Sequence, residues 1–382
     1  MTQYLVNRLV QAAVVFFVFL SIAFFLIQAQ PGDFTSFYLL DPNITPEARA
    51  QIKASFGLDR PVYVQYLQYV GNFFQGDFGS SFQFNRPVLS VIMERLPRTV
   101  ILFLTATVIS FYMGFVMGKV IAWRRGGLVE YASTIGGVFL YTVFTPWFGL
   151  IMIWAFAFKL GWLPIGKFVT PELWSSATFT ANSVFGQMLL AATVSSVALL
   201  ALAIFLQRLR IRQPQPVLFG SALLLIAGCF VYFAMGPISA YVWDITRHMF
   251  LPITVLTLIS FAGTMLLTRN SMLETLREDY VLAARAKGLP TNVIRDRHVA
   301  RNAMLPVVTS LVFSVAFAFD GGVITETIFS WPGIGLTLIN SSIEGDLPLA
   351  VGAFLFTGVF ALVAHMAADI LYVFLDPRIR YQ

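Results

Sequence analysis

About eight apolar stretches, each close to twenty residues or longer, decide what this chain can fold into. They lie at roughly 9–28, 99–118, 132–158, 187–206, 217–236, 249–268, 303–325 and 348–372. A helix of about 20 apolar residues crosses a bilayer, and backbone in lipid must satisfy its hydrogen bonds internally. The sequence therefore predicts an all-α, polytopic integral membrane protein.

The composition agrees with this prediction. Of the 382 residues, 58% are hydrophobic and 12% are charged, about half of the charged fraction of a soluble domain. The net charge of +6 does not indicate nucleic acid as a partner, because the Lys and Arg residues sit in short loops where they set topology. The single cysteine, Cys229, excludes a disulfide within the chain, and three scattered histidines do not predict a metal site.

The charged residues between the apolar stretches indicate an orientation. One set of connecting segments carries the basic residues Arg8, Lys119, Arg124, Arg125, Arg208, Arg210, Arg212, Arg378 and Arg380. The opposite set carries more acidic residues, namely Glu172, Asp244, Glu344 and Asp346. Basic loops stay in the cytoplasm, so an even number of spans places both termini there. We expect a multi-pass protein of the inner (plasma) membrane.

The longest segment between two spans, 31–97, is expected to form an extracytoplasmic cap. A helix at the membrane interface is favoured by the spacing of Tyr63, Tyr66 and Tyr69. A short amphipathic helix is expected from Arg86 to about Arg98. The alternative for the whole segment is a self-contained fold without a partner. The chain then divides into a first transmembrane helix at 1–30, the cap region and a transmembrane domain at 98–382.

A charged segment at 278–301, which we call the knuckle, separates two apolar stretches. Good helix formers precede Gly288, which stands where a C-terminal helix cap would lie, and Pro290 is suited to open the next helix. The pattern predicts a helix, a sharp turn and a second helix, rich in Arg and Lys and facing the cytoplasm.

The knuckle resembles the coupling loop of ABC importer permeases. Ala283, Ala284 and Gly288 match the family's EAA motif, although Leu282 stands where the motif has Glu. The wider pattern resembles the dipeptide, oligopeptide and nickel branch. It comprises 325–333, 376–380 and the residues Glu278, Asp279, Tyr280, Arg285, Lys287, His298, Arg301, Leu305 and Pro306. The distance from Gly288 to Leu305 and Pro306 is longer than in sugar permeases.

The resemblance implies a type I ABC importer permease fold with six core helices. The apolar pair at about 187–236 is then an inserted hairpin, expected at the lipid-facing periphery, and 269–303 is a cytoplasmic coupling loop. The family implies three kinds of protein partner: a second homologous permease subunit, two ABC ATPase subunits that bind ATP and Mg, and an extracytoplasmic solute-binding protein. No cofactor is expected in this chain. Arg297 joins the residues above as a candidate for docking the ATPase.

Four residues are candidates for a substrate pathway or gate. Asp320 lies in an apolar stretch, where a charge costs at least ~2.5–3.5 kcal/mol. It faces the pathway and meets a cationic group of the substrate, such as a peptide α-amine, or it pairs with a neighbouring helix, or it already lies in the outer vestibule. Glu326 is nearer the outer end, and with Phe329 and Trp331 it is a candidate for an outer gate.

The sequence contains none of the common catalytic motifs. It has no GxxxxGK[ST], nucleophile elbow, HExxH or Cys/His cluster, so we expect neither an enzyme nor an ATP-binding chain. The energy for transport then comes from separate ATPase subunits or from an ion gradient. The second option leaves a stand-alone secondary transporter or channel as the alternative. The expected substrate is a dipeptide or oligopeptide, with a nickel chelate or an oligosaccharide as alternatives.

Overall fold

The computed structural model describes residues 2–29, 60–124, 126–209, 215–317 and 322–375. Its contacts divide the chain into two compact units. The first is made of Met1–Gly149 and Ile253–Gln382, and the second of Leu150–Pro252. The boundaries between the units fall inside two helices, α7 (Thr145–Met152) and α11 (Ser239–Thr275).

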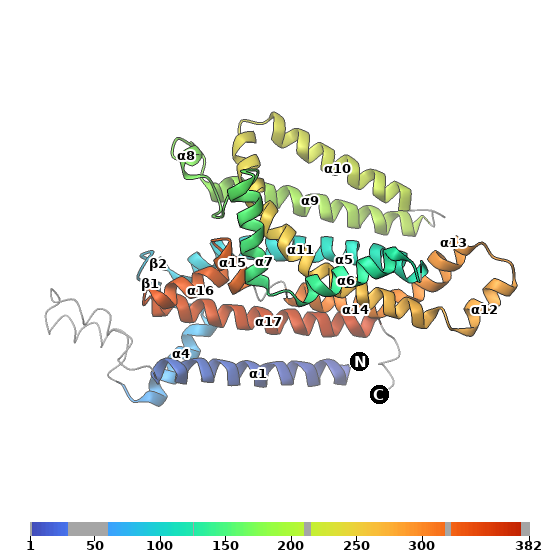
Figure 1. Cartoon of the computed structure of the whole chain (residues 1–382). Helices are drawn as coiled ribbons and strands as arrows, with labels where there is room; N and C mark the ends of the chain where they lie inside the picture. Colours follow the sequence, from blue (N-terminus) through green and yellow to red (C-terminus); the bar gives the residue numbers. More distant parts are fainter. Residues whose placement is uncertain (1, 30–59, 125, 210–214, 318–321, 376–382) are drawn as a thin grey trace. The chain divides into compact units, whose positions relative to one another are not determined.

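The described residues are mainly helical, which confirms the all-α prediction (Figure 1). The first unit contains α1 (Thr2–Gln28), α4 (Val62–Phe74), β1 (Ser80–Ser81), β2 (Arg86–Pro87), α5 (Val88–Trp123), α6 (Leu128–Thr142), α12 (Asp279–Ala286), α13 (Thr291–Val293), the π-helix η2 (Ile294–Val299), α14 (Ala300–Phe317), α15 (Val323–Ile328), α16 (Ile334–Ile343) and α17 (Leu347–Leu375). The second unit contains the π-helix η1 (Ile153–Lys159), α8 (Pro171–Trp174), α9 (Ala181–Arg208) and α10 (Gln215–Met235).

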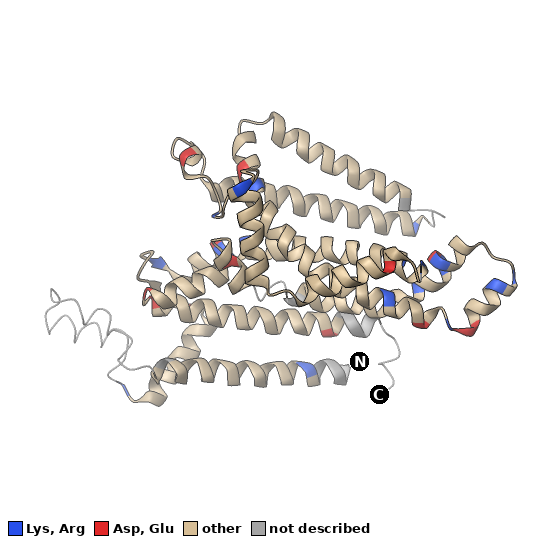
Figure 2. Ribbon diagram, viewed as in Figure 1, with Lys and Arg blue, Asp and Glu red and all other residues tan. Residues whose placement is uncertain are grey.

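Seven of the described helices are long and apolar enough to cross a membrane, and the number is eight if a bent pair counts as one span. They correspond to the eight predicted apolar stretches. In the first unit, Lys, Arg, Asp and Glu lie mostly towards the helix ends, whereas the middle of the helices is largely uncharged (Figure 2). This distribution is what a bilayer requires, because charges are costly at its centre.

The stretch expected as one span at 132–158 is broken. The helix α6 and the following helix are bent by 105° at the break, where Val143 has an extended backbone with ψ of 138°. Pro146 lies in the first turn of α7 rather than inside one long helix, at a position where its missing N–H would have no intrahelical partner. The stretch expected at 303–325 likewise contains two helices, α14 and α15.

The amphipathic helix expected to end near Arg98 instead continues to Trp123 as α5, through Pro97. The boundary expected between 31–97 and 98–382 therefore lies inside one helix. A proline inside a helix removes one backbone hydrogen bond, and tertiary packing holds this helix together. Its first turns are buried in a cluster formed by Val88, Val91, Ile92, Ile334, Leu349 and Ala353.

The Tyr-rich helix expected after the first span is α4, and it packs against α1. The Ser21 and Tyr66 hydroxyls are hydrogen-bonded at 2.7 Å, and the Phe24 ring contacts the rings of Tyr66 and Tyr69. α1 also lies along α17 (Figure 1), where Leu20, Ala23 and Leu355 are buried together.

Close packing of α5 against α11 depends on two glycines four residues apart. A Cβ at Gly114 would lie 2.7 Å from the Phe261 carbonyl oxygen, and a Cβ at Gly118 would lie 2.6 Å from the Met265 carbonyl oxygen. These distances leave no room for a side chain, so Gly114 and Gly118, which form a GxxxG pattern, let the two helices approach closely.

In the second unit, α9 and α10 lie side by side (Figure 1) and bury few side chains. Ser195 of α9 lies 3.5 Å from the Cys229 sulfur of α10. Elsewhere in this unit, the Asp244 carboxylate accepts hydrogen bonds from Thr170 and from the Trp174 indole N–H at 2.6–2.9 Å. The first turns of α11 are thereby tied to α8.

Candidate functional site

The first helix of the knuckle, α12, ends at a glycine cap. The Gly288 N–H donates to the Arg285 carbonyl at 2.9 Å, and the Leu289 N–H donates to the Ala284 carbonyl at 3.3 Å. These are the two hydrogen bonds of a Schellman motif, and Gly288 has the left-handed φ of +71° that is typical of it. Since α13 begins directly after Pro290, the predicted helix, turn and helix are confirmed.

The inner face of the knuckle is buried against three longer helices. Its apolar side chains and those of the helix ends form one cluster, namely Val281, Ala284, Ile294, Val299, Ala122 of α5, Met272 of α11, and Ala300 and Ala303 of α14. The Ser271 hydroxyl donates to the Ala303 carbonyl at 2.9 Å, which joins α11 to α14. The knuckle is therefore attached to the ends of α5, α11 and α14.

The outer face of the knuckle is exposed. Of the predicted coupling residues, the exposed ones are Glu278, Asp279, Tyr280, Ala283, Arg285, Lys287, Gly288, Arg297, Arg301, Leu305 and Pro306. Ala284 is the exception, because it belongs to the buried cluster. Leu305 and Pro306 lie further along α14. Two exposed residues of the knuckle have large hydrophobic side chains, with 39% of Tyr280 and 55% of Leu282 accessible.

At this end of the first unit, ion pairs connect α5 to η2 and α11 to α6. Lys119 Nζ of α5 lies 3.2 Å from Asp296 Oδ1 of η2, and Asp296 also accepts from its neighbour Arg295 at 2.6 Å. Arg269 of α11 donates through Nε to Glu130 Oε1 of α6 at 3.1 Å. Arg269, expected to end a span, lies inside α11, which continues to Thr275.

The gate candidate Glu326 lies in α15, outside the candidate spans, and is fully buried. Its Oε1 accepts from the Thr99 hydroxyl at 2.7 Å, and its Oε2 accepts from the Leu336 N–H at 2.9 Å. The Thr99 oxygen in turn accepts from the Ile334 N–H at 2.9 Å. Burial raises the pKa of Glu326 to about 7, although these hydrogen bonds act in the opposite direction.

The turn between α15 and α16 is pressed against α5. Trp331 is fully buried and its indole N–H donates to the Arg98 carbonyl at 3.1 Å, and Phe329 is also buried. A Cβ at Gly333 would collide with the Glu326 carboxylate and the Thr99 hydroxyl. Glu326, Phe329 and Trp331 thus contact their own chain, and we call this cluster with Thr99 and Gly333 the turn lock.

The fourth pathway candidate, Asp320, lies outside the described residues. Its described neighbour Gly322 faces the Phe103 ring, which a Cβ at this position would overlap. Within the described ranges, no group of three or more His, Cys, Asp or Glu residues is arranged to hold a metal ion.

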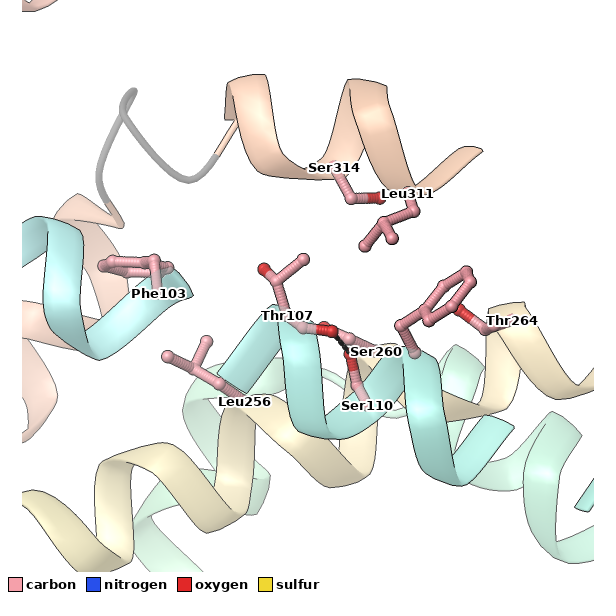
Figure 3. Close-up of a pocket in the computed structure, with 9 residues that line it drawn as sticks. Phe103, Thr107, Ser110, Leu256, Ser260, Thr264, Leu311 and Ser314 are labelled. Carbon is pink, nitrogen blue, oxygen red and sulfur yellow. Dashed lines mark hydrogen bonds between the residues drawn. The ribbon is translucent and has the colours of Figure 1, made fainter. Parts of the chain in front are cut away.

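A cavity of about 290 Å³ lies between α5, α11 and α14 (Figure 3). It is lined by Phe103, Thr107, Ser110 and Phe111 of α5, Leu256, Ser260 and Thr264 of α11, and Leu311 and Ser314 of α14. None of these residues was among the candidates predicted from the sequence. The sequence signal that could have indicated them is a pair of hydroxyl residues about one helical turn apart in an apolar span, such as Thr107 and Ser110 or Ser260 and Thr264.

Comparison with known proteins matches the whole chain. Residues 110–381 match the family described as binding-protein-dependent transport system inner membrane component, and residues 1–103 match its N-terminal membrane component. The chain is 31% identical to the di/tripeptide transport system permease protein DppB of Pseudomonas aeruginosa. It is 29% identical to the oligopeptide transport system permease protein AppB of Bacillus subtilis and to the dipeptide transport system permease protein DppB of Escherichia coli. All three alignments cover 100% of both chains. The chain therefore belongs to the family of binding-protein-dependent transport system inner membrane components, as a multi-pass, non-enzymatic permease subunit of a system with other subunits.

Proposed function

We propose that this chain forms half of the translocation pathway of an ATP-driven importer for dipeptides or oligopeptides. Its partners are a second homologous permease subunit, two ABC ATPase subunits that bind ATP and Mg, and an extracytoplasmic solute-binding protein. The peptide substrate is supported by the names of the three relatives, which are peptide permeases from three bacteria.

One observation carries the coupling part of this proposal. The three helices that line the cavity, α5, α11 and α14, are the same helices whose ends hold the knuckle. A force applied to the knuckle therefore reaches the cavity walls through continuous helices. α5 alone contributes Thr99 to the turn lock, Thr107 and Ser110 to the cavity, and Ala122 to the knuckle cluster.

The exposed face of the knuckle is the proposed docking surface for an ATPase subunit. It combines the hydrophobic side chains of Tyr280 and Leu282 with charges of both signs. The docking residues are Glu278, Asp279, Tyr280, Ala283, Arg285, Lys287, Gly288, Arg297 and Arg301, with Ala284, Leu305 and Pro306 supporting them. A hydrophobic centre with a charged rim is typical of a protein interface.

The turn lock is the proposed outer gate of the pathway. Glu326, Phe329 and Trp331 hold the α15–α16 turn against α5, so opening the gate requires these contacts to move together. Asp320 is proposed to contact a cationic group of the substrate. Its replacement in Asp320→Asn is then expected to weaken transport and to leave assembly and basal ATP hydrolysis intact.

The proposed topology has both termini in the cytoplasm and a cap at 31–97 outside the membrane. The described part of the cap includes α4, which packs on α1. Reporter fusions after Arg212 and after Arg380 are expected to report a cytoplasmic location. A periplasmic signal from the fusion after Arg212 would exclude a transmembrane hairpin formed by α9 and α10.

Reconstitution tests the proposed function. The chain is purified with its permease partner and the ATPase subunits, placed in liposomes, and supplied with the binding protein and a radiolabelled dipeptide. We expect accumulation that requires ATP and is competed by other peptides. Competition by a nickel chelate or an oligosaccharide, but not by peptides, would overturn the proposal that peptides are the substrate. Uptake driven by an ion gradient without the ATPases would favour the stand-alone transporter.

A further inference from the structure

Most of the hydroxyl groups that line the cavity are free to bind a ligand. Many Ser and Thr side chains of this chain donate to a carbonyl one turn earlier in their own helix, as Thr142, Thr268 and Thr309 do at 2.8–3.0 Å. Within the described residues, the cavity hydroxyls of Thr107, Ser260, Thr264 and Ser314 have no hydrogen-bond partner. Ser110 donates to the Thr107 carbonyl at 2.9 Å, which leaves its oxygen able to accept.

These hydroxyls converge from three helices. Thr107 on α5 and Ser314 on α14 extend into the space between their helices, and Ser260 and Thr264 come from α11 (Figure 3). Ser260 and Ser314 are exposed, and Thr107 and Thr264 are half-buried, so their hydroxyls are accessible to a molecule that enters the cavity. The cavity is therefore suited to hold polar groups of a ligand or water.

The chemistry of the lining narrows the kind of ligand. Each hydroxyl both donates and accepts a hydrogen bond, so it matches either the N–H or the C=O of a peptide group. None of the nine lining residues carries an ionisable side chain. Phe103, Phe111, Leu256 and Leu311 supply apolar surface for side chains of varied shape.

We infer that these hydroxyls bind the main-chain amide groups of the transported peptide, and that the lining of this cavity does not discriminate between peptides by side-chain charge. The inference rests on the proposed function, since it concerns how the same cavity meets a peptide. It assigns a recognition role to Thr107, Ser110, Ser260, Thr264 and Ser314.

The test compares three dipeptides whose second side chain is neutral, basic or acidic. The reconstituted transporter is assayed at saturating binding protein with Ala-Ala, Ala-Lys and Ala-Glu. The triple variant Ser260→Ala, Thr264→Val and Ser314→Ala is expected to lower maximal uptake of all three by a similar factor, roughly five-fold for each hydrogen bond lost. The matched control Thr309→Val removes a hydroxyl of α14 that bonds back to Leu305 and is expected to transport like the native protein.

A charge placed in the cavity provides the second arm. Ser260→Asp is expected to lower uptake of Ala-Glu much more than uptake of Ala-Lys, because the carboxylate repels only one of them. Equal effects on the two peptides, or native uptake in the triple variant, would overturn the inference. The inference would also be overturned if the triple variant lost uptake of only the acidic or only the basic dipeptide.

Two checks separate this inference from its premises. Subunit co-purification and basal ATP hydrolysis must be native in each variant. If the triple variant fails to assemble, uptake by the single variants Ser260→Ala and Ser314→Ala tests the inference instead. If the native protein itself does not accumulate peptides, the proposed function has failed. If the native protein transports and the variants do not differ from it, only the hydroxyl inference has failed.

Discussion

Gly288 offers a sharp test of the knuckle as the transmission element. Its φ of +71° lies in the left-handed region, where a residue with a Cβ is strained. No atom lies within 4 Å of the position that a Cβ would occupy. A substitution at Gly288 therefore changes the backbone preference of the turn without creating a collision.

The cost of this change follows from the backbone alone. A left-handed conformation costs a residue other than glycine roughly 1–2 kcal/mol, with β-branched Val at the upper end. A loss of that size shifts the balance towards other turn conformations by roughly 5–30-fold. The spans are unaffected, so Gly288→Val is expected to insert and to pair with its permease partner. It is expected to lose most of its ATPase subunits on purification and most substrate-stimulated ATP hydrolysis in liposomes.

Two further variants make the result interpretable. Gly288→Ala is expected to fall between the native protein and Gly288→Val. Gly288→Asn is expected to remain close to native, because Asn tolerates positive φ better than other residues. Native co-purification and native stimulated hydrolysis in Gly288→Val would refute the reasoning. An Asn variant as defective as the Val variant would show that the side chain, and not the backbone angle, is responsible.

Three other predictions test the framework around the site. Gly118→Ala is expected to lower the Tm of the purified complex, because an overpacked contact costs roughly 1–3 kcal/mol. Gly136 has open space around it, so Gly136→Ala is expected to leave the Tm unchanged or to raise it. Equal Tm values for the two variants would contradict this prediction. Lys119→Asp is expected to reduce transport per ATP hydrolysed, and the second change Asp296→Lys is expected to restore it. The loss of stability should stay within about 1 kcal/mol, because the ion pair is partly exposed. If the double variant does not restore coupling, the Lys119–Asp296 contact does not transmit it. Burial raises the pKa of Glu326 to about 7, so the protonated side chain stabilises the fold at low pH and this contribution is lost as the pH rises through 7. The Tm of the native protein is therefore expected to fall between pH 5 and pH 8, and the Tm of Glu326→Gln is expected to change less. Parallel Tm profiles of the two proteins against pH would refute this prediction.

The local features of this fold were accessible from the sequence. A helical span needs only a sufficient run of apolar residues, so eight stretches could be identified without knowing their neighbours. The knuckle turn was equally local, because the cap at Gly288 depends on hydrogen bonds within a few residues. Family motifs then identified this segment as a candidate docking surface.

Helix ends and breaks were less accessible. Pro97 indicated the end of a helix, yet α5 continues through it because Val88, Val91 and Ile92 pack on residues more than 200 positions later in the chain. In the opposite direction, the long apolar run at 132–158 concealed the break at Val143. Hydropathy reports whether a segment tolerates lipid, and it does not report where the backbone turns.

The sequence by itself determined the membrane class, the number of spans and the position of the knuckle, because each depends on residues close together in the chain. Only the tertiary structure decided the rest. It brought Thr99 to Glu326 across 227 positions, and it gathered hydroxyls from α5, α11 and α14 around one cavity. Hydrogen-bond partners and cavity walls depend on how helices pack, and packing joins residues whose spacing in the sequence carries no periodic signal.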